Sequence, residues 1–351
     1  MSYRDKRVLI TGGLGFIGSN LVIRLVREGA RVVVLDNLTP GCGGNVFNLQ
    51  EVAGDVEVIE AEIGEAPRPV FENCDVIFNL AGEISHIHSM QFPERDLQIN
   101  TVAQLRFLLA CAEAARGVRI VFAGTRQVYG VPKYLPVDEA HPVQPVDFNG
   151  VHKYAATMYH QMLSRAGHLD AIVLRLTNVY GPRMALDVVC QGFLNTYLRR
   201  MVLGEPIDIY GDGSQLRDPL YVDDAVEAFL RAGLVSPRIS RSYNCGGPEA
   251  LPIRKIAETA AEIAGLGAPR VMPFPPDRKP IDIGSYRTDN RRIERELGWT
   301  PRMAFADGLR SAYEFFKANQ SAYLPGAESN PPCRMPEHYG VRSKLQYSVA
   351  Q

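Results

Sequence analysis

Short apolar runs alternate with longer polar or helical segments through the first half of the chain. Runs that are apolar at most positions, instead of at every second one, are typical of strands buried on both faces of a parallel sheet. Their alternation with helical segments predicts an α/β fold with a doubly wound parallel sheet. The runs lie at residues 8–10, 31–36, 56–60, 76–80, 120–123 and 171–176.

Two segments between these runs have helical periodicity, and they cover about residues 94–116 and 149–166. Both carry apolar residues on more than one face, which is more than a single buried face requires. On the first helix, one apolar face is formed by Leu97, Val102, Leu105, Leu109 and Ala112.

A glycine-rich turn, Thr11–Gly18, follows the first run and opens a segment in which apolar residues recur every fourth position from Ile17. In such a turn, Gly12 allows the tight exit from the strand, Gly15 lets the backbone approach a pyrophosphate, and Gly18 lets the helix pack on the sheet. The anion would lie at the helix N-terminus. This context predicts a dinucleotide-binding site, and a glycine turn that serves packing alone is the alternative.

Asp36 ends the strand predicted at 31–36. At this distance from a glycine turn, a carboxylate can accept a hydrogen bond from a ribose 2′-hydroxyl, and it would repel a 2′-phosphate. The residue therefore favours NAD over NADP as the cofactor.

The regular alternation stops after Gly181-Pro182, and prolines then separate shorter elements. We predict a smaller C-terminal lobe over the carboxyl ends of the strands, where ligands bind in such sheets. The cofactor domain is predicted at 1–182, and a later segment at about 218–245 is predicted to complete it. The substrate lobe is predicted at 183–217 and 246–318. Residues 319–351 lack periodicity and are predicted to be an irregular tail.

Composition narrows the possible partners. The 351 residues have 46% hydrophobic content and a net charge of −1, with acids and bases dispersed. This balance suggests neither a nucleic-acid nor a membrane partner. Six scattered cysteines argue against a metal site or a disulfide framework, so the cytosol is the expected compartment. The charged N-terminus and the lack of a long apolar run predict a soluble, unprocessed protein.

An ordered series of motifs over about residues 6–318 resembles the extended short-chain dehydrogenase/reductases of the nucleotide-sugar epimerase and dehydratase group. Each motif alone could arise by chance, but their common order is specific. Besides the glycine turn and Asp36, the series contains Asn79–Gly82, Asn100, Thr125 before Val128–Gly130, Lys153, Asn178–Arg183, Gly211–Asp218 and Leu297–Trp299.

The resemblance implies which residues contact each ligand. Glu62 and Ile63 would lie at the adenine, and Leu80–Gly82 along the cofactor ribose. Asn178 and Arg217 would hold the diphosphate of the nucleotide sugar, although Arg217 could instead be a surface partner of Asp218 or Asp212. The full implied NAD site is Gly12, Gly15, Phe16, Ile17, Gly18, Asp36, Asn37, Glu62, Ile63, Leu80, Ala81, Gly82, Asn100 and Lys153, and the implied substrate residues are Arg126, Asn178, Arg183 and Arg217.

The resemblance also implies a transient oxidation of the sugar, in which a base removes a hydroxyl proton. The usual base is a tyrosine four residues before the lysine on one helix face, but here that position is Asn149. An amide cannot act as a base near neutral pH. Tyr154 lies next to Lys153 and would point away from it on a helix. Lys153 would still hold the nicotinamide ribose, and Asn149 would form hydrogen bonds only.

The missing base must therefore come from another part of the chain. The candidates are His86, His88 and Glu83, which follow the predicted strand at 76–80. Histidine is the side chain that titrates most readily near neutrality. The alternative for His86 and for His88 is an ordinary loop residue with its hydrogen bonds satisfied.

Thr125 occupies the family position whose hydroxyl contacts the reacting sugar oxygen. Dehydratases of the group carry an Asp-Glu pair directly after it, whereas this chain has Arg126-Gln127. Because neither residue exchanges protons near neutral pH, water elimination is disfavoured. A cation at Arg126 suits a sugar with a carboxylate, unless the side chain is simply solvated.

These observations predict an NAD-dependent epimerase that acts on a nucleotide-linked hexose, with an acidic sugar as one option and an unconventional base. The resemblance also implies a homodimer formed through the helices at 94–116 and 149–166. The alternatives are a dehydratase or decarboxylase, or a non-catalytic protein that binds NAD and a nucleotide sugar.

Overall fold

The computed structural model describes residues 2–188, 192–236 and 241–326. Its centre is a seven-stranded sheet in the order β11-β6-β5-β4-β1-β2-β3, and each neighbouring pair is parallel. The predicted doubly wound α/β fold is confirmed. The strands are β1 (Arg7–Thr11), β2 (Arg31–Asp36), β3 (Val56–Glu60), β4 (Val76–Asn79), β5 (Arg119–Thr125), β6 (Asp170–Leu176) and β11 (Arg241–Cys245).

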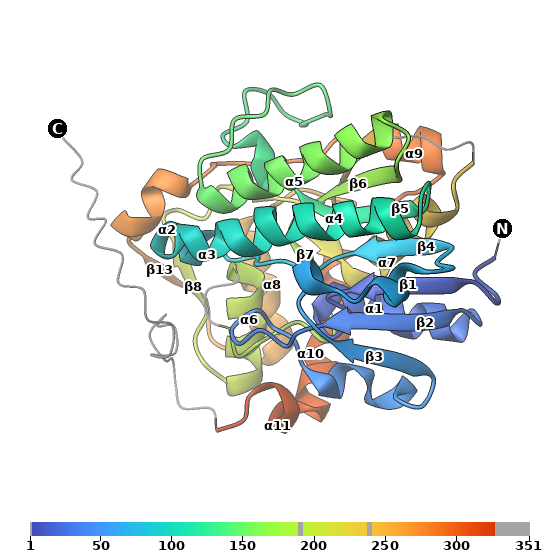
Figure 1. The fold of residues 1–351 in the computed structure, drawn as a ribbon. Helices are drawn as coiled ribbons and strands as arrows, with labels where there is room; N and C mark the ends of the chain where they lie inside the picture. The colour runs from blue at the N-terminus through green and yellow to red at the C-terminus, as the bar shows by residue number, and fades with distance from the viewer. Residues whose placement is uncertain (1, 189–191, 237–240, 327–351) are drawn as a thin grey trace.

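Helices cover both faces of the sheet (Figure 1). Alternate side chains of β1 enter different cores: Val8 and Ile10 pack in the core that includes residues of α1 (Phe16–Arg27) and α7 (Val222–Leu234), and Leu9 packs in the core of α4 (Ala103–Ala114). This alternation makes the strands apolar at nearly every position, because each face needs its own apolar row.

The helix predicted at 94–116 begins one residue earlier and is interrupted. It consists of α3 (Pro93–Leu97), a π-helical turn η4 (Gln98–Val102) and α4, and the helix predicted at 149–166 is α5 (Phe148–Arg165). Phe107 and Leu108 form the buried side of α4, whereas Leu97 and Leu109 of the predicted apolar face are 37% and 48% exposed. The predicted face is therefore only partly turned outward, because Ala112 of the same set packs against the core.

Shorter elements follow the main alternation. The strands are β7 (Val179–Tyr180), β8 (Asp208–Tyr210), β9 (Leu216–Arg217), β10 (Leu220–Tyr221), β12 (Leu251–Pro252) and β13 (Arg270–Met272). The helices are α2 (His86–Gln91), α6 (Phe193–Leu203), α8 (Ile253–Ala264), α9 (Arg291–Leu297), α10 (Phe305–Ala318) and α11 (Gln320–Tyr323). The 3₁₀-helical segments are η1 (Val46–Val52), η2 (Ile63–Glu65), η3 (Arg68–Phe71), η5 (Arg126–Tyr129) and η6 (Pro276–Ile281).

The predicted irregular tail is wrong at its beginning, because residues 320–323 form α11, which packs beside Asn45 and Asn48. Tyr323 is buried and its hydroxyl donates to Oδ1 of Asn48 at 2.6 Å. Asn45 donates to the backbone oxygen of Ala322 at 3.0 Å. These long-range bonds hold a segment that has too few residues to show periodicity. The remainder of the predicted tail, 327–351, lies outside the described residues.

Within the described ranges, no helix has both the length and the apolar character needed to cross a membrane. The same part of the chain contains no group of three or more histidine, cysteine, aspartate or glutamate side chains arranged to hold a metal ion.

Candidate functional site

One cavity of about 1220 Å³ joins the carboxyl ends of the central strands to the second half of the chain. Its wall includes the glycine turn, the ends of β4 and β5, and residues 178, 217 and 281–283. Sites for one small ligand usually measure roughly 300 to 1,000 Å³. The space is therefore sufficient for two ligands that meet end to end.

The glycine turn at the start of α1 leaves no room for side chains. Gly12 has φ +67°, and a Cβ there would lie 2.9 Å from the backbone nitrogen of Ala81. A Cβ on Gly18 would lie 2.1 Å from the oxygen of Gly12. The turn thus brings bare backbone to the cavity at the N-terminus of α1, which is the arrangement that a dinucleotide pyrophosphate requires.

Asp36 lies at the end of β2 and its carboxylate is fixed by the backbone. Oδ2 accepts from the amide of Leu14 at 3.0 Å, and Oδ1 accepts from the amide of Leu38 at 2.9 Å. The residue lines the cavity. Each carboxylate oxygen can accept a further bond, so the group suits the ribose hydroxyls of NAD.

We expect NAD to bind more tightly than NADP by on the order of 10²-fold, because a like-charge contact with a 2′-phosphate costs several kcal/mol. Asp36→Ala should reduce the ratio of the two affinities. The variant should bind NAD more weakly, because a hydrogen-bond acceptor is lost, and NADP more tightly, because the charge repulsion is removed. Calorimetric titration of both cofactors measures the ratio. Equal affinities in the unmodified protein would contradict the assignment of Asp36.

The other implied NAD residues are also found at the cavity, with one exception. Phe16, Asn37, Glu62, Ile63 and Leu80–Gly82 contribute to its wall. Asn100 lies behind it, where its side chain donates to the backbone oxygen of Glu83 at 3.0 Å. A Cβ on Gly82 would lie 2.7 Å from Oδ1 of Asn100 and 2.9 Å from Nζ of Lys153. Gly82 therefore leaves the space that these two side chains occupy.

Lys153 lies on α5 and lines the cavity. Burial lowers the pKa of its ammonium group, while the negative charges of Asp96 and Glu83 oppose that effect. A buried cation of this kind is suited to holding ribose hydroxyls and to stabilising negative charge that develops on a sugar oxygen.

Asn149 also lines the cavity, but its amide is engaged in the wall. Its Nδ2 donates to the backbone oxygen of Glu83 and to Oδ2 of Asp96, both at 2.9 Å. Nδ1 of His152 lies 2.7 Å from the other oxygen of Asp96. Asn149 thus connects α5 to α3 and to the loop after β4, which is the hydrogen-bonding role that the sequence predicts.

The three candidate bases occupy different places. His86 lines the cavity, whereas Glu83 and His88 are not among the described residues that line it. Glu83 is 2% exposed, and its Oε1 accepts from the amides of Ile84 and Ser85, both at 3.1 Å. Burial lowers the pKa of His88. The geometry favours His86 among the three.

Arg126 and Asn178 both line the cavity and contact each other. Nη2 of Arg126 donates to Oδ1 of Asn178 at 3.1 Å, and the guanidinium carbon lies 4.8 Å from the centroid of the Tyr286 ring. Nη1 of Arg126 is buried and has no hydrogen-bond partner in the described structure. Burial lowers the pKa of this guanidinium. The site therefore holds a cation with unused donor capacity.

Arg217 lies at the same part of the cavity. Its Nη1 donates to the backbone oxygens of Leu216 and Gly284, at 2.8 and 2.6 Å. Its ion pair is with Asp282, at 3.9 Å, instead of the partners considered from the sequence. Burial, together with the nearby charge of Arg126, lowers the pKa of Arg217 to about 10.

Arg183, expected at the substrate, instead joins two parts of the fold. It has φ +70°, and its guanidinium donates to the backbone oxygen of Asn48 at 3.2 Å and to Oδ1 of Asn20 at 3.0 Å. It also pairs with Glu51 at 2.5 Å. These contacts leave it outside the described wall of the cavity.

Asp147 and Gln127 take part in the site although the sequence did not single them out for catalysis. Asp147 accepts from the amide of Gly150 at 2.6 Å as the N-cap of α5, and from Nε2 of Gln127 at 3.0 Å. An aspartate before a helical segment is a recognisable N-cap signal, but it says nothing about a second partner from another element.

The comparisons agree with this geometry. The model of the NAD dependent epimerase/dehydratase family matches residues 8–246. The chain belongs to that family, and it is an NAD-dependent enzyme of it.

Individual relatives differ in their reactions. The chain is 35% identical over 318 residues to a UDP-glucose 4-epimerase of Mycolicibacterium smegmatis, covering 89% of this chain and 98% of that protein. It is 32% identical over 327 residues to UDP-glucuronic acid decarboxylase 1 of Danio rerio, covering 90% of this chain and 74% of that protein. Among solved structures, MoeE5 in complex with UDP-glucuronic acid and NAD has 29% identity and a TM-score of 0.78, covering 89% of this chain and 99% of that one.

Proposed function

We propose that this protein is an NAD-dependent nucleotide-sugar epimerase that works by transient oxidation of the sugar. The observation that carries the choice of reaction is the pair after Thr125, where the buried side chains of Arg126 and Gln127 line the cavity. Neither can donate and recover a proton near neutral pH, so elimination of water has no acid and base there. Oxidation followed by reduction needs one base, and bound NAD would accept and return the hydride.

We further propose that the sugar carries an anionic group. The unpartnered Nη1 of Arg126 is a buried cationic donor, and leaving such a donor unsatisfied is costly. A carboxylate can accept from a guanidinium through two oxygens, which would satisfy it. The structure of MoeE5 with UDP-glucuronic acid and the similarity to UDP-glucuronic acid decarboxylases support this substrate class.

Incubation of the purified protein with NAD and a panel of neutral and acidic sugar nucleotides tests the proposal, with products followed by NMR. An epimer of an acidic sugar is the expected product. Loss of carbon dioxide would favour a decarboxylase, for which the same arginine and the Danio rerio relative are specific support. Binding of NAD and sugar nucleotides with no conversion would favour a non-catalytic binder.

We also propose a homodimer. Four large apolar residues on α3, α4 and α5 are strongly exposed: Leu97 at 37%, Leu109 at 48%, Val151 at 47% and Met162 at 55%. The helices α4 and α5 lie side by side across one face of the molecule (Figure 1). Exposed apolar side chains on neighbouring helices are typical of a protein interface.

Light scattering should therefore give twice the chain mass at micromolar concentration, and the double variant L109E/M162E should be a monomer because two charges cannot be buried unpaired in the interface. Val58→Glu, at a residue 47% exposed on β3, is the matched control and should leave the dimer intact. A wild-type monomer would contradict the proposal.

The cytosol is the proposed compartment, since Cys42, Cys74, Cys111 and Cys245 are free thiols.

A further inference from the structure

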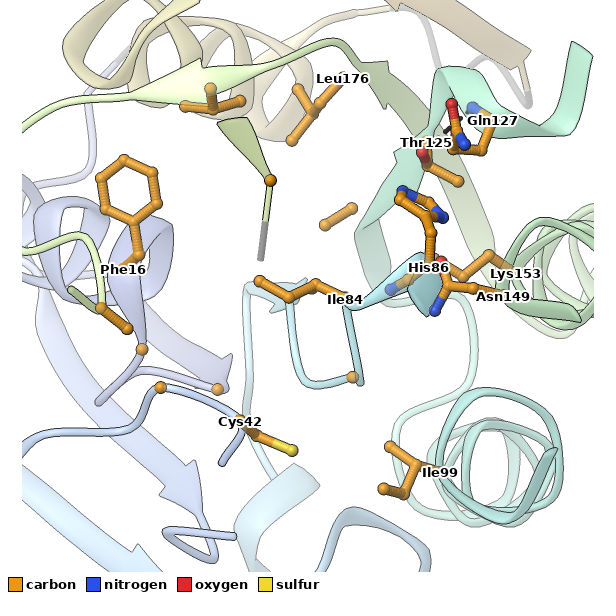
Figure 2. Close-up of a pocket in the computed structure, with 18 of the residues that line it drawn as sticks. Phe16, Cys42, Ile84, His86, Ile99, Thr125, Gln127, Asn149, Lys153 and Leu176 are labelled. Atoms are coloured by element: carbon orange, nitrogen blue, oxygen red, sulfur yellow. Dashed lines mark hydrogen bonds between the residues drawn. The ribbon is translucent and has the colours of Figure 1, made fainter. Parts of the chain in front are cut away.

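The imidazole of His86 lies between the cavity and a buried carboxylate. Its Nδ1 is 3.1 Å from Oδ2 of Asp147. The side chain of Asp147 is fully buried, whereas that of His86 is 34% exposed and lines the cavity. Figure 2 shows the ring on the same side of the cavity as Thr125 and Lys153, away from Phe16 and Cys42. The Nδ1 edge of the ring thus lies against the carboxylate of Asp147, and the side chain also lines the cavity.

Asp147 is held in place from two further directions. The amide of Gly150 donates to its Oδ1 at 2.6 Å, and Nε2 of Gln127 donates to its Oδ2 at 3.0 Å. Burial alone would raise the pKa of this carboxyl, but the charge of His86 and these hydrogen bonds outweigh burial and keep the pKa below its usual value. The carboxylate is therefore ionised and immobile.

This arrangement fixes which nitrogen of His86 is available. A carboxylate 3.1 Å from Nδ1 favours the tautomer of the neutral imidazole that carries its proton on Nδ1, and that tautomer leaves the lone pair on Nε2. Asp147 is the charged group in contact with the ring, and Lys153 from α5 and Arg126 from η5 line the same cavity as His86.

We propose that His86 replaces the missing tyrosine as the base of the reaction, and that Asp147 is its positioning residue. This inference rests on the proposed epimerase function. In the oxidation, the hydroxyl proton of the sugar moves to Nε2 of His86, the C–O bond becomes C=O, and the hydride of that carbon passes to bound NAD. In the return step the hydride enters the opposite face of the carbonyl carbon, and Nε2 gives its proton back to the oxygen. No oxidant or proton is consumed overall.

The first test is His86→Asn, which keeps a polar side chain but has no proton acceptor of suitable basicity. We expect kcat to fall by on the order of 10²- to 10⁴-fold. Calorimetric affinities for NAD and for the sugar nucleotide should stay within a few-fold of wild type, which shows that the variant is folded. His168→Asn, at an exposed histidine after α5, is the matched control and should behave as wild type.

The second test is Asp147→Asn, which retains the N-cap of α5 because asparagine caps helices as well as aspartate. It removes the negative charge beside Nδ1, a change that acts on the protonated imidazole more than on the neutral one. We expect kcat to fall by about tenfold or more with KM little changed, and the acid limb of kcat/KM to move to lower pH. A residue that only caps the helix would not move that limb.

The outcomes separate this inference from the function on which it rests. A wild-type enzyme that epimerises a sugar nucleotide, together with a folded His86→Asn variant that keeps turnover within about tenfold of it, overturns the role of His86 alone. An unchanged pH profile in Asp147→Asn overturns the role of Asp147. A wild-type protein that binds NAD but converts no sugar nucleotide overturns the proposed function, and the role of His86 with it.

Discussion

Lys153→Met is expected to abolish most of the turnover, with kcat lower by on the order of 10²- to 10⁴-fold. Methionine fills similar space but supplies no cation at the point where the side chains of Lys153 and Asn100 pack against Gly82. The negative charge that develops on the sugar oxygen then has no nearby positive partner on α5. Steady-state kinetics on the converted sugar nucleotide measures the loss, and calorimetry should show weaker NAD binding.

The pH dependence gives an independent readout of Lys153. Because burial lowers its pKa, the charged form is lost at a lower pH than for an exposed lysine as the pH rises. Activity should therefore decline on the alkaline side, and Lys153→Arg should move that decline to higher pH, since a guanidinium stays charged.

Lys255→Met is the matched control, because Lys255 is exposed on α8, and it should leave kcat and the pH profile unchanged. A Lys153→Met enzyme with turnover within about tenfold of wild type would contradict the role given to this lysine.

Local sequence signals predicted the fold and the cofactor side of the site. Three features of the cofactor side are encoded by residues that are adjacent in the sequence: the glycine turn, the strand that ends at Asp36 and the run before Leu80. Their ends also meet at one edge of the sheet, because parallel strands place their carboxyl ends together. The order of those strands, with β1 between β4 and β2, brings all three to one cavity.

The direction of individual side chains could not be predicted from the same signals. Arg183 and Asn178 belong to one motif, yet Asn178 lines the cavity and Arg183 turns to Asn48 and Asn20. Its positive φ reverses the chain at that point, and nothing in the motif requires it. The periodicity of the sequence likewise predicted an apolar face that includes Leu109 of α4. It could not predict that Leu109 is exposed, because a second set of apolar residues, with Phe107 and Leu108, packs in the core.

The proposed base, His86, was the least predictable feature, because its placement depends on a contact between distant elements. His86 begins α2 and Asp147 precedes α5, and only the packing of these two helices brings their side chains to 3.1 Å. The sequence could therefore name three candidates after β4 but could not choose among them. The absence of the usual base, by contrast, could be predicted from the sequence alone, because the amide of Asn149 cannot act as a base near neutral pH.

Arg126→Met is expected to change which sugar the enzyme prefers. A charge-assisted hydrogen bond contributes roughly 1.5 to 3 kcal/mol, so kcat/KM for an acidic sugar nucleotide should fall by on the order of 10- to 10²-fold. The value for the neutral counterpart with the same nucleotide and ring configuration should change by only a few-fold, because that sugar has no negative charge to lose. Replacing a buried cation by an apolar side chain of similar length should leave the melting temperature unchanged or higher.

Comparing the loss of kcat/KM for the acidic and the neutral sugar decides whether Arg126 binds the negative charge of the sugar or only supports the wall of the cavity. Its other contacts are with Asn178 and the ring of Tyr286, and both are lost in the variant whatever the substrate. Equal losses for the acidic and the neutral sugar would therefore assign Arg126 to the wall and remove the main support for an anionic substrate. Arg295→Met, at a side chain 71% exposed on α9, is the matched control and should leave both values unchanged. A selective loss on the acidic sugar is the result that the unpartnered Nη1 predicts.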